Sequence, residues 1–369
     1  MKKLKKTKKL KLTKPDVNAL KAKLPIGQGK TADEKMSEAL SDVPRITNET
    51  VSEHREEVLA GARKYIYPLQ HSKHRIVRVS IALFAVVIIV FFVSIGLSLY
   101  KFQSTSGFTY NVTRIIPFPV AKAGKSWVSY ESYLFELRRN LHYYKTQQPQ
   151  AVLTGKQGKA LIQHLKEQAM TQAIEDAYVK QLASRYHVSV SSTAVNNEVE
   201  LVRSQNRLGD SDRVFREVLN EFWGWNEGDF KRQLKQEMLR QAVVAKLDTA
   251  TNDRANLALK QLVGGANFAA VAKYQSDDVA TKNNAGKYGS PITVDDSNLS
   301  PILSQEIFKL NPGETSGIIN TGYTLDIVKV LTASGSRRTA AHIQFTFKDI
   351  NTYIKPLQDK TPAHQYIKV

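Results

Sequence analysis

One hydrophobic run dominates the pattern of polar and apolar positions along the chain. Residues 79–100 are 22 consecutive residues without a charge. A helix of that length measures about 33 Å, enough to cross a hydrocarbon core of roughly 30 Å. A buried helix of a soluble protein is rarely apolar on every side, and a cleaved signal peptide lies at the N-terminus with a shorter apolar region. The pattern therefore predicts a transmembrane helix.

Hydrophobic positions recur at helical spacing between residues 156 and 248. The longest stripe is typical of an amphipathic helix and consists of Leu161, Leu165, Ala169, Ala173, Ala177 and Leu182. Ser129 and Asn226 have the side chains of helix N-caps. Gly209 and Gly224 are placed to end helices. These features together predict an all-helical domain.

Two stretches at the edges of these helices have other patterns. Residues 101–125 combine β-branched residues with Pro117 and Pro119, which predicts a linker that leads into an edge strand. Trp223 and Trp225 lie at the junction of two predicted helices. They either form a peptide-binding surface or pack between the helices, and packing is the favoured interpretation.

The pattern changes again over residues 252–347. A helical stretch at about 254–274 precedes a polar loop and a short helix in "SPILSQEIFKLN". The segments "GIINT", "YTLDIVKVL" and "AAHIQFTF" have strand composition and are joined by short turns, which predicts antiparallel pairing. The whole chain is thus expected to be α+β with one transmembrane helix, an all-α domain and a domain with a small antiparallel sheet.

The net charge of +19 is uneven along the chain. The first 14 residues hold eight lysines and no acidic residue, so we predict that they are disordered. A nucleic-acid-binding tail is one interpretation, and a cytoplasmic tail beside anionic lipid is the one that the neighbouring membrane run favours. Positive residues are denser before that run than after it, which predicts a cytoplasmic N-terminus and an extracytoplasmic segment 101–369.

Several kinds of chemistry are excluded by the residues themselves. The chain contains no cysteine, which excludes disulfides, thiol catalysis and cysteine-ligated metals. Its eight histidines show no HExxH-type metal spacing. We therefore expect no metal and no cofactor. Because the membrane run favours a basic tail beside lipid, we also expect no nucleic-acid partner.

The helical region resembles the N-terminal chaperone domain of the PrsA/SurA-type extracytoplasmic foldases. The resemblance lies in "AIEDAYVKQLASRYHVSVSSTAVNNEVELVRSQN" and "FREVLNEFWGWNEGDFKRQLKQEMLRQAVVAKL". Its specific part is the spacing of helix, short "HVSVS" link and helix. "VAKAGKSWVSYESY" also looks like the entry strand and first helix of that family.

The last region is similar to a parvulin-type peptidyl-prolyl isomerase domain. The similarity rests on "FAAVAKYQSDD", "AGKYG" and "LSPILSQEIFKLNPGETSGII", of which the run Pro312–Gly317 is the most specific. It implies that Asp277 occupies the active-site Asp/Cys position and that Asp278 stands where proline is common. It also implies that Leu299 and Leu303 bind the substrate proline, with Phe268 and Phe308 in the core.

The chain departs from that family in two places. "GYTLDIVKV" has Asp326 where the last strand of the family carries a histidine, and the first His-Ile-Leu-Val strand is missing before residue 254. "AAHIQFTF", with His342, follows the last strand instead. Either the domain is in effect permuted, with residues 340–347 paired to 323–331 and His342 near Asp277 and Asp326, or this segment begins a truncated second domain.

The resemblance implies a membrane-anchored foldase that isomerises X-Pro bonds in unfolded exported polypeptides. The alternative is a holdase chaperone whose isomerase-like domain is inactive. The lipid bilayer is the other expected partner. The expected boundaries are 1–78 for a basic, largely disordered cytoplasmic segment, 79–100 for the transmembrane helix, 101–250 for the chaperone domain, 251–347 for the isomerase domain and 348–369 for a C-terminal tail. The final "PAHQYIKV" is expected to be either frayed or a truncated continuation.

Overall fold

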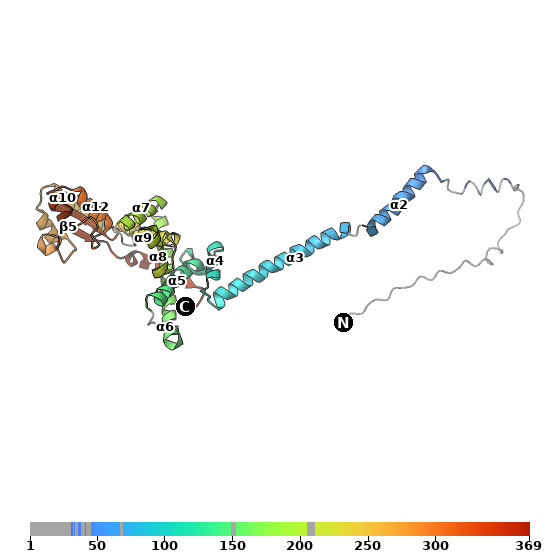
Figure 1. Cartoon of the computed structure of the whole chain (residues 1–369), viewed down its shortest axis with the longest axis horizontal. Coiled ribbons are helices and arrows are strands. Elements are labelled where there is room, and N and C mark those ends of the chain that lie inside the picture. Colours follow the sequence, from blue (N-terminus) through green and yellow to red (C-terminus); the bar gives the residue numbers. More distant parts are fainter. Residues whose placement is uncertain are drawn as a thin grey trace. The chain divides into compact units, whose positions relative to one another are not determined.

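The computed structural model describes residues 31, 33, 36–37, 41, 46–66, 69–148, 153–204 and 211–369. The chain divides into two compact units, residues 1–88 and 89–369, which are coloured along the sequence in Figure 1. The lysine-rich first 14 residues and Gly209, predicted to be a disordered tail and a helix end, lie outside the described residues.

Part of the N-terminal segment that the sequence predicts to be largely disordered is helical. Helix α2 covers Asn48–Ile66. Its described side chains are nearly all exposed, so local interactions must start it. The backbone N–H of Thr47 donates to the Thr50 hydroxyl at 3.0 Å, and Glu49 in the first turn complements the helix dipole.

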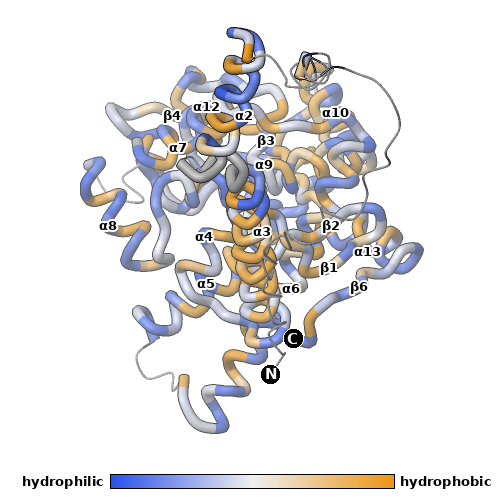
Figure 2. The backbone as a smooth tube through the Cα atoms, turned by 90° about the vertical axis from the view of Figure 1, so that its right-hand side faces the viewer, coloured by the Kyte–Doolittle hydropathy of each residue, from blue (hydrophilic) through white to orange (hydrophobic). Residues whose placement is uncertain are grey.

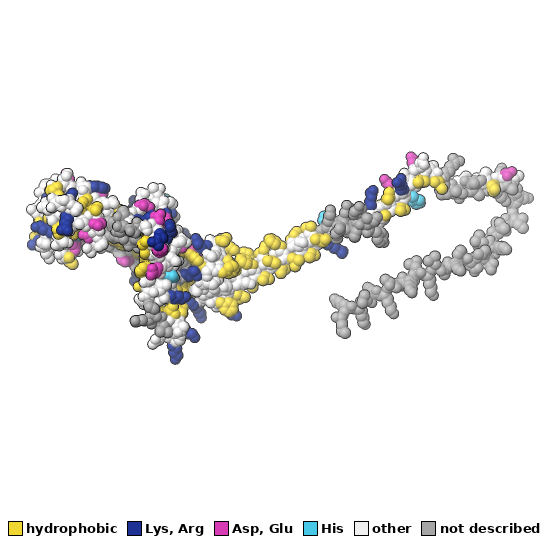
Figure 3. All heavy atoms as spheres, viewed as in Figure 1, with side chains coloured by type: hydrophobic (Ala, Val, Ile, Leu, Met, Phe, Trp, Pro, Cys, Tyr) yellow, Lys and Arg dark blue, Asp and Glu magenta, His cyan; other side chains and the backbone are white. Residues whose placement is uncertain are grey.

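Helix α3, Leu69–Gly96, contains the long hydrophobic run. The side chains of residues 74–94 are exposed, and hydrophobic residues follow one another along the helix in Figures 2 and 3. The stretch His74–Lys101 is long and apolar enough to cross a membrane. The C-terminal end of this stretch is buried instead of exposed. Ile95 is 4% exposed, and Leu99 is fully buried in the core of the second unit.

The second unit is structured from the end of α3 onward, where the sequence predicts a linker. A π-helical turn, η2 (Leu97–Lys101), is followed by helix α4 (Gly107–Ile115). Ser106 caps α4 by accepting a hydrogen bond from the backbone N–H of Thr109. The expected linker therefore belongs to the folded domain.

A short hairpin and a set of helices follow. They are β1 (Pro119–Ala123), β2 (Ser126–Ser129), α5 (Tyr130–Thr146), α6 (Gly155–Arg185), α7 (Ser192–Ser204), α8 (Asp212–Trp223) and α9 (Glu227–Leu247). The two predicted N-caps are confirmed, because the Ser129 hydroxyl caps α5 and Asn226 forms a capping box at α9. Gly224, with φ of 67°, ends α8. Trp225 is buried and stacks on Trp223, with ring centroids 5.6 Å apart. This contact fits the interpretation that the two tryptophans pack between the helices.

The remaining elements form the second part of this unit. They are α10 (Thr249–Val263), α11 (Phe268–Gln275), η3 (Lys282–Asn284), α12 (Pro301–Lys309), β3 (Ile319–Asn320), β4 (Thr324–Ser334), β5 (Arg337–Thr346), α13 (Asn351–Lys360) and β6 (His364–Gln365). The single helix predicted at 254–274 is two helices. Gly265, at φ of 89°, adopts a left-handed conformation that favours glycine and breaks it.

Strand β5 pairs with β4 along its whole length. The antiparallel register runs from Thr324 opposite Thr346 to Ser334 opposite Arg337, in a sheet of order β3-β4-β5. Residues 340–347 thus pair with the strand that precedes them. This is the arrangement expected of a permuted domain and not of a truncated second one.

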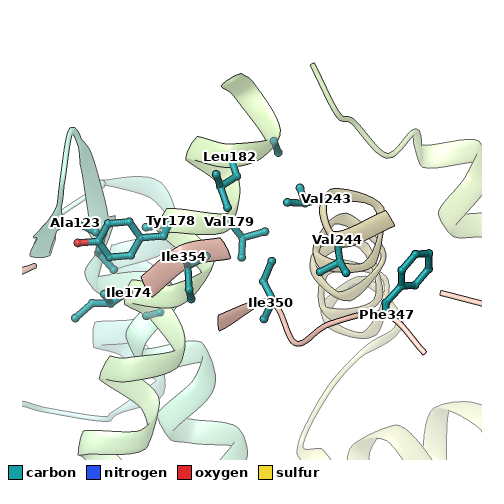
Figure 4. Packing of buried hydrophobic residues seen from close by; sticks show 14 of the residues in the cluster. Ala123, Ile174, Tyr178, Val179, Leu182, Val243, Val244, Phe347, Ile350 and Ile354 are labelled. Carbon is teal, nitrogen blue, oxygen red and sulfur yellow. The ribbon is translucent and has the colours of Figure 1, made fainter. Parts of the chain in front are cut away.

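The C-terminal residues 348–369, expected to be a tail, pack on the rest of the unit. Helix α13 packs on α6, with Ile354 fully buried, and β6 pairs with β1 to complete a sheet of order β2-β1-β6. The apolar positions Ile350 and Ile354 are one helical turn apart and both face the core. Figure 4 shows this core between residues of α6 and α9 and the segment that follows β5.

Candidate active site

One face of the β4–β5 hairpin carries an unusual pair of polar residues. His342 lies opposite Val328 in the register, and Asp326 precedes Val328 by two residues. Side chains two apart on a strand point to the same face, so Asp326 and His342 share a face. His342 is 4% exposed and Asp326 is fully buried. Buried groups of this kind are retained only with partners.

Each ring nitrogen of His342 faces a carboxylate. Nδ1 lies 3.1 Å from Asp326 Oδ1, and Nε2 lies 2.9 Å from Asp278 Oδ2. Both nitrogens can donate only when the ring is protonated. The arrangement therefore favours an imidazolium held between two carboxylates.

Burial and charge act in opposite directions on these groups. Burial by itself lowers the pKa of His342, but hydrogen bonds to and the charges of Asp326 and Asp278 raise that pKa above its ordinary value. Burial likewise raises the pKa of Asp278, but hydrogen bonds from Thr281 and His342 bring it below its ordinary value. Both shifts favour the charged forms of the two side chains.

Threonine hydroxyls extend the network at both ends. Thr281 donates to Asp278 Oδ2, and its Oγ1 lies 3.1 Å from His342 Nε2. Thr324 donates to Asp326 Oδ2 at 2.5 Å. The carboxylate of Asp278 is 21% exposed, whereas Asp326 is completely enclosed. The network thus reaches solvent at Asp278 and Thr281.

The segment around Gly286 runs along the free edge of β5 and holds the histidine backbone. His342 N–H donates to Gly286 O at 2.8 Å, and Tyr288 N–H donates to Ala340 O at 3.0 Å. Gly286 has φ of 73°, and a Cβ there would meet His342 O at 2.3 Å. Only glycine fits this approach.

An apolar cluster adjoins the charged network. The Tyr288 ring stacks on the His342 ring with centroids 4.5 Å apart. Tyr288 also belongs to the cluster that includes Leu299, Leu303 and Phe308. The two predicted substrate-binding leucines therefore share one hydrophobic cluster, and Tyr288 joins this cluster to the histidine. Phe268, the first residue of α11, is buried as predicted, in the cluster that also contains Phe345 of β5.

Asp277 lies outside this network. Its Oδ1 accepts from Arg254 Nη2 at 2.6 Å, and its Oδ2 accepts from the backbone N–H of Thr346 at 3.0 Å. The chain is extended at Ser276, and adjacent residues of an extended chain point to opposite sides. Of the predicted catalytic residues, the structure brings Asp326 and His342 together, and it places Asp278 where Asp277 was expected.

Three residues of the site escaped the sequence analysis as functional residues. Asp278 was assigned to a position often held by proline, and nothing in the pattern singled out Thr281 or Tyr288. The short Asp-x-x-Thr spacing was the available signal for Thr281, since a side chain three residues on can bond back to the aspartate. In the part of the chain that the structure describes, no group of three His, Asp or Glu side chains is arranged to hold a metal ion.

Comparisons with known proteins identify two domain families in the chain. Residues 70–244 match the SurA-like N-terminal domain, and residues 236–332 match the PPIC-type PPIase domain. The chain thus joins a SurA-like N-terminal domain to a parvulin-type isomerase domain. It is homologous to Foldase protein PrsA 2 of Bacillus cereus, with 24% identity over 210 residues that cover 47% of this chain and 70% of that relative. The isomerase match ends before β5, so His342 lies beyond the matched stretch.

Proposed function

We propose that the chain is a membrane-anchored, extracytoplasmic peptidyl-prolyl isomerase that assists the folding of exported polypeptides. The match to an isomerase domain supports the reaction class, and the foldase relative supports the role. The observation that carries the proposal is the position of His342 between two carboxylates, beside an apolar cluster.

Prolyl isomerisation needs no nucleophile, metal or cofactor. Rotation about the amide meets a barrier of about 18–20 kcal/mol because the C–N bond has partial double-bond character. The two X-Pro isomers differ by only about 0.5–1 kcal/mol, so both are present in unfolded chains. A catalyst must hold the proline and favour the twisted amide over the planar one.

The site divides these tasks between two groups of residues. Leu299, which is half-buried, would contact the proline ring, and Leu303, which is buried, would support it in the apolar cluster beside Tyr288. Asp278 and His342 would supply a fixed charge distribution next to the rotating amide, where preorganised groups act most strongly. Asp326 acts through His342, which it keeps protonated and oriented. We do not assign a catalytic task to Asp277.

The helical domain offers a surface for unfolded clients. A groove of about 600 Å³ lies between α7, α9 and the isomerase domain, and its lining includes Leu234, Met238, Ile302 and Tyr323. Apolar side chains in a concave surface suit an extended chain. Exported polypeptides are therefore the proposed partners, with α3 as the anchor in a bilayer.

A proline-limited refolding assay with the full chain in detergent micelles tests the reaction. We expect acceleration of refolding by the unaltered chain and its loss in His342→Gln. His364→Gln, which changes an exposed histidine, serves as the matched control and should behave like the unaltered chain. Suppressed aggregation of the client without acceleration by the unaltered chain would instead support the holdase alternative.

A further inference from the structure

Helix α4 packs Tyr110 and Val112 against the core but leaves two other apolar residues exposed. It buries Thr109 and Thr113, each 2% exposed, while Phe108 is 67% and Ile115 is 82% exposed. A surface helix of a globular protein turns its apolar stripe toward the core. The buried hydroxyls are satisfied, since Thr113 Oγ1 donates to Tyr110 O at 2.7 Å and Thr109 Oγ1 lies 2.8 Å from Ser106 Oγ. The exposure of Phe108 and Ile115 is therefore part of the fold.

The loop after α4 continues this apolar surface toward α3. The Phe118 ring lies 6.4 Å from the Phe92 ring, which belongs to the last turns of α3. Trp127 is 62% exposed, and it lines a hollow of about 400 Å³ together with Pro117, Phe118 and Pro119. We call Ile115, Pro117, Phe118, Pro119 and Trp127 the α4–Trp127 surface.

The backbone of this loop can leave water at little cost. Prolines at 117 and 119 have no N–H to satisfy. The carbonyl of Phe118 accepts from Tyr130 N–H at 2.6 Å, and the carbonyl of Pro119 accepts from the Tyr100 hydroxyl at 2.6 Å. Backbone groups near a hydrocarbon phase must be paired within the protein, and these two carbonyls are paired.

The surface is fixed relative to the end of α3. Ile95 and Leu99 are buried in the domain core, and Tyr130 Oη donates to Leu99 O at 2.6 Å. Phe92 stands eight residues before Tyr100, which is about 12 Å along a helix. The contact between Phe118 and Phe92 therefore sets the loop at the depth of the lipid interface whenever α3 spans a bilayer.

The chain segment that carries the surface holds charges of one sign. Residues 101–130 contain four basic residues, Lys101, Arg114, Lys122 and Lys125, and no acidic one. The Lys122 ammonium lies 5.4 Å from the centroid of the Trp127 ring. Basic residues beside exposed aromatic and aliphatic side chains suit an anionic lipid surface.

We propose that the α4–Trp127 surface docks on the lipid interface and holds the chaperone domain against the outer face of the bilayer in one orientation. This inference rests on the proposed anchoring by α3. It adds a second membrane contact that the anchor alone does not require. The partner is the bilayer itself and not a client polypeptide.

Site-directed fluorescence on the full chain tests the proposal, and the absence of cysteine makes single labels unambiguous. A nitrobenzoxadiazole label is placed at Ile115→Cys, with Val263→Cys as the control because its side chain is equally exposed, at 81%. Val87→Cys reports on the anchor. The chains are reconstituted in vesicles of phosphatidylcholine and phosphatidylglycerol and quenched with iodide in water or nitroxides on lipids.

The proposal expects the label at 115 to be several-fold less accessible to iodide than the label at 263, and to be quenched by nitroxides near the headgroups. A label at 87 that is protected while 115 is as accessible as 263 overturns this inference and leaves the anchor standing. A label at 87 that iodide reaches overturns both. Protection of 115 only after an unfolded client is added overturns the lipid assignment in favour of a client surface.

Discussion

His342 and Asp278 are 64 residues apart in the chain, yet Nε2 of the histidine lies 2.9 Å from Oδ2 of the aspartate. The contact depends on β5, which places the histidine on the sheet, and on the turn after α11, which presents the aspartate. Asp326 holds the opposite ring nitrogen at 3.1 Å. The proposed site is thus assembled from three separate segments.

The neighbouring aspartates provide a matched test of which carboxylate serves the reaction. We expect Asp278→Asn to lower kcat/KM of prolyl isomerisation by about 10²-fold, the size typical of losing one preorganised electrostatic group. Asp277→Asn should leave kcat/KM nearly unchanged, because that carboxylate pairs with Arg254. Its half-exposed ion pair contributes about 0–1 kcal/mol of stability. The opposite ranking, measured with a proline-containing peptide, would restore the sequence-based assignment to Asp277.

The opposing pKa shifts predict a stability maximum in mildly acidic solution. The raised pKa of His342 stabilises the fold fully below its ordinary value of 6.5, and this contribution is lost as the pH rises through the folded pKa. The lowered pKa of Asp278 stabilises the fold above its ordinary value of 3.8, and this contribution is lost as the pH falls through the folded pKa. The free energy of unfolding should therefore be largest between about pH 4 and pH 6.5.

Chemical denaturation of the full chain in detergent at a series of pH values measures this profile. In His342→Gln the decline on the alkaline side should disappear, because the titrating group is gone. An unaltered alkaline decline in that variant would assign the pH dependence to another group.

Much of the architecture follows from local patterns. The uncharged run predicts α3, and side-chain caps at Ser129 and Asn226 mark the starts of α5 and α9. The family pattern locates both strands of the hairpin, and its departure at Asp326 points to His342. These features depend on composition and on hydrogen bonds between residues a few positions apart. The residue types and spacings that produce them can be recognised in a sequence.

Other features depend on contacts that no local pattern shows. Asp277 and Asp278 are chemically identical, and only the direction of the extended chain decides which one meets the histidine. Helix α4 conceals its role, because Phe108 and Ile115 face outward while Thr109 and Thr113 are buried. The C-terminal segment reads as a tail until β1 and α6 provide the surfaces that it covers.

Gly286 tests how closely the polar loop must approach β5. Gly286→Ala places a Cβ 2.3 Å from His342 O and forces a side chain into a left-handed conformation, at φ of 73°. We expect a loss of stability of roughly 1–3 kcal/mol from the backbone strain, and loss of isomerase activity as the loop moves. Gly289→Ala is the control, since a Cβ there meets nothing within 4 Å. Equal unfolding midpoints for the two variants would contradict the role of this contact.

The C-terminal helix α13 should be required for the stability of the whole second unit. Ile354 is fully buried in a core that also contains Phe345 of the isomerase hairpin and Val243 of α9. Ile354→Ala should lower the free energy of unfolding by about 2–5 kcal/mol, whereas Lys355→Ala, at an exposed position, should change it by less than about 0.5 kcal/mol.

The shared core also predicts that the helical domain and the isomerase hairpin unfold cooperatively. Since residues from the helical domain, the hairpin and α13 share one cluster, tryptophan fluorescence from the helical domain and isomerase activity should be lost at the same denaturant concentration. Ile354→Ala should move both transitions together. If activity survived at a denaturant concentration that unfolds the tryptophan environment, the isomerase hairpin would be stable without the helices. The residues of the shared core would then lie close together without coupling the stability of the two parts.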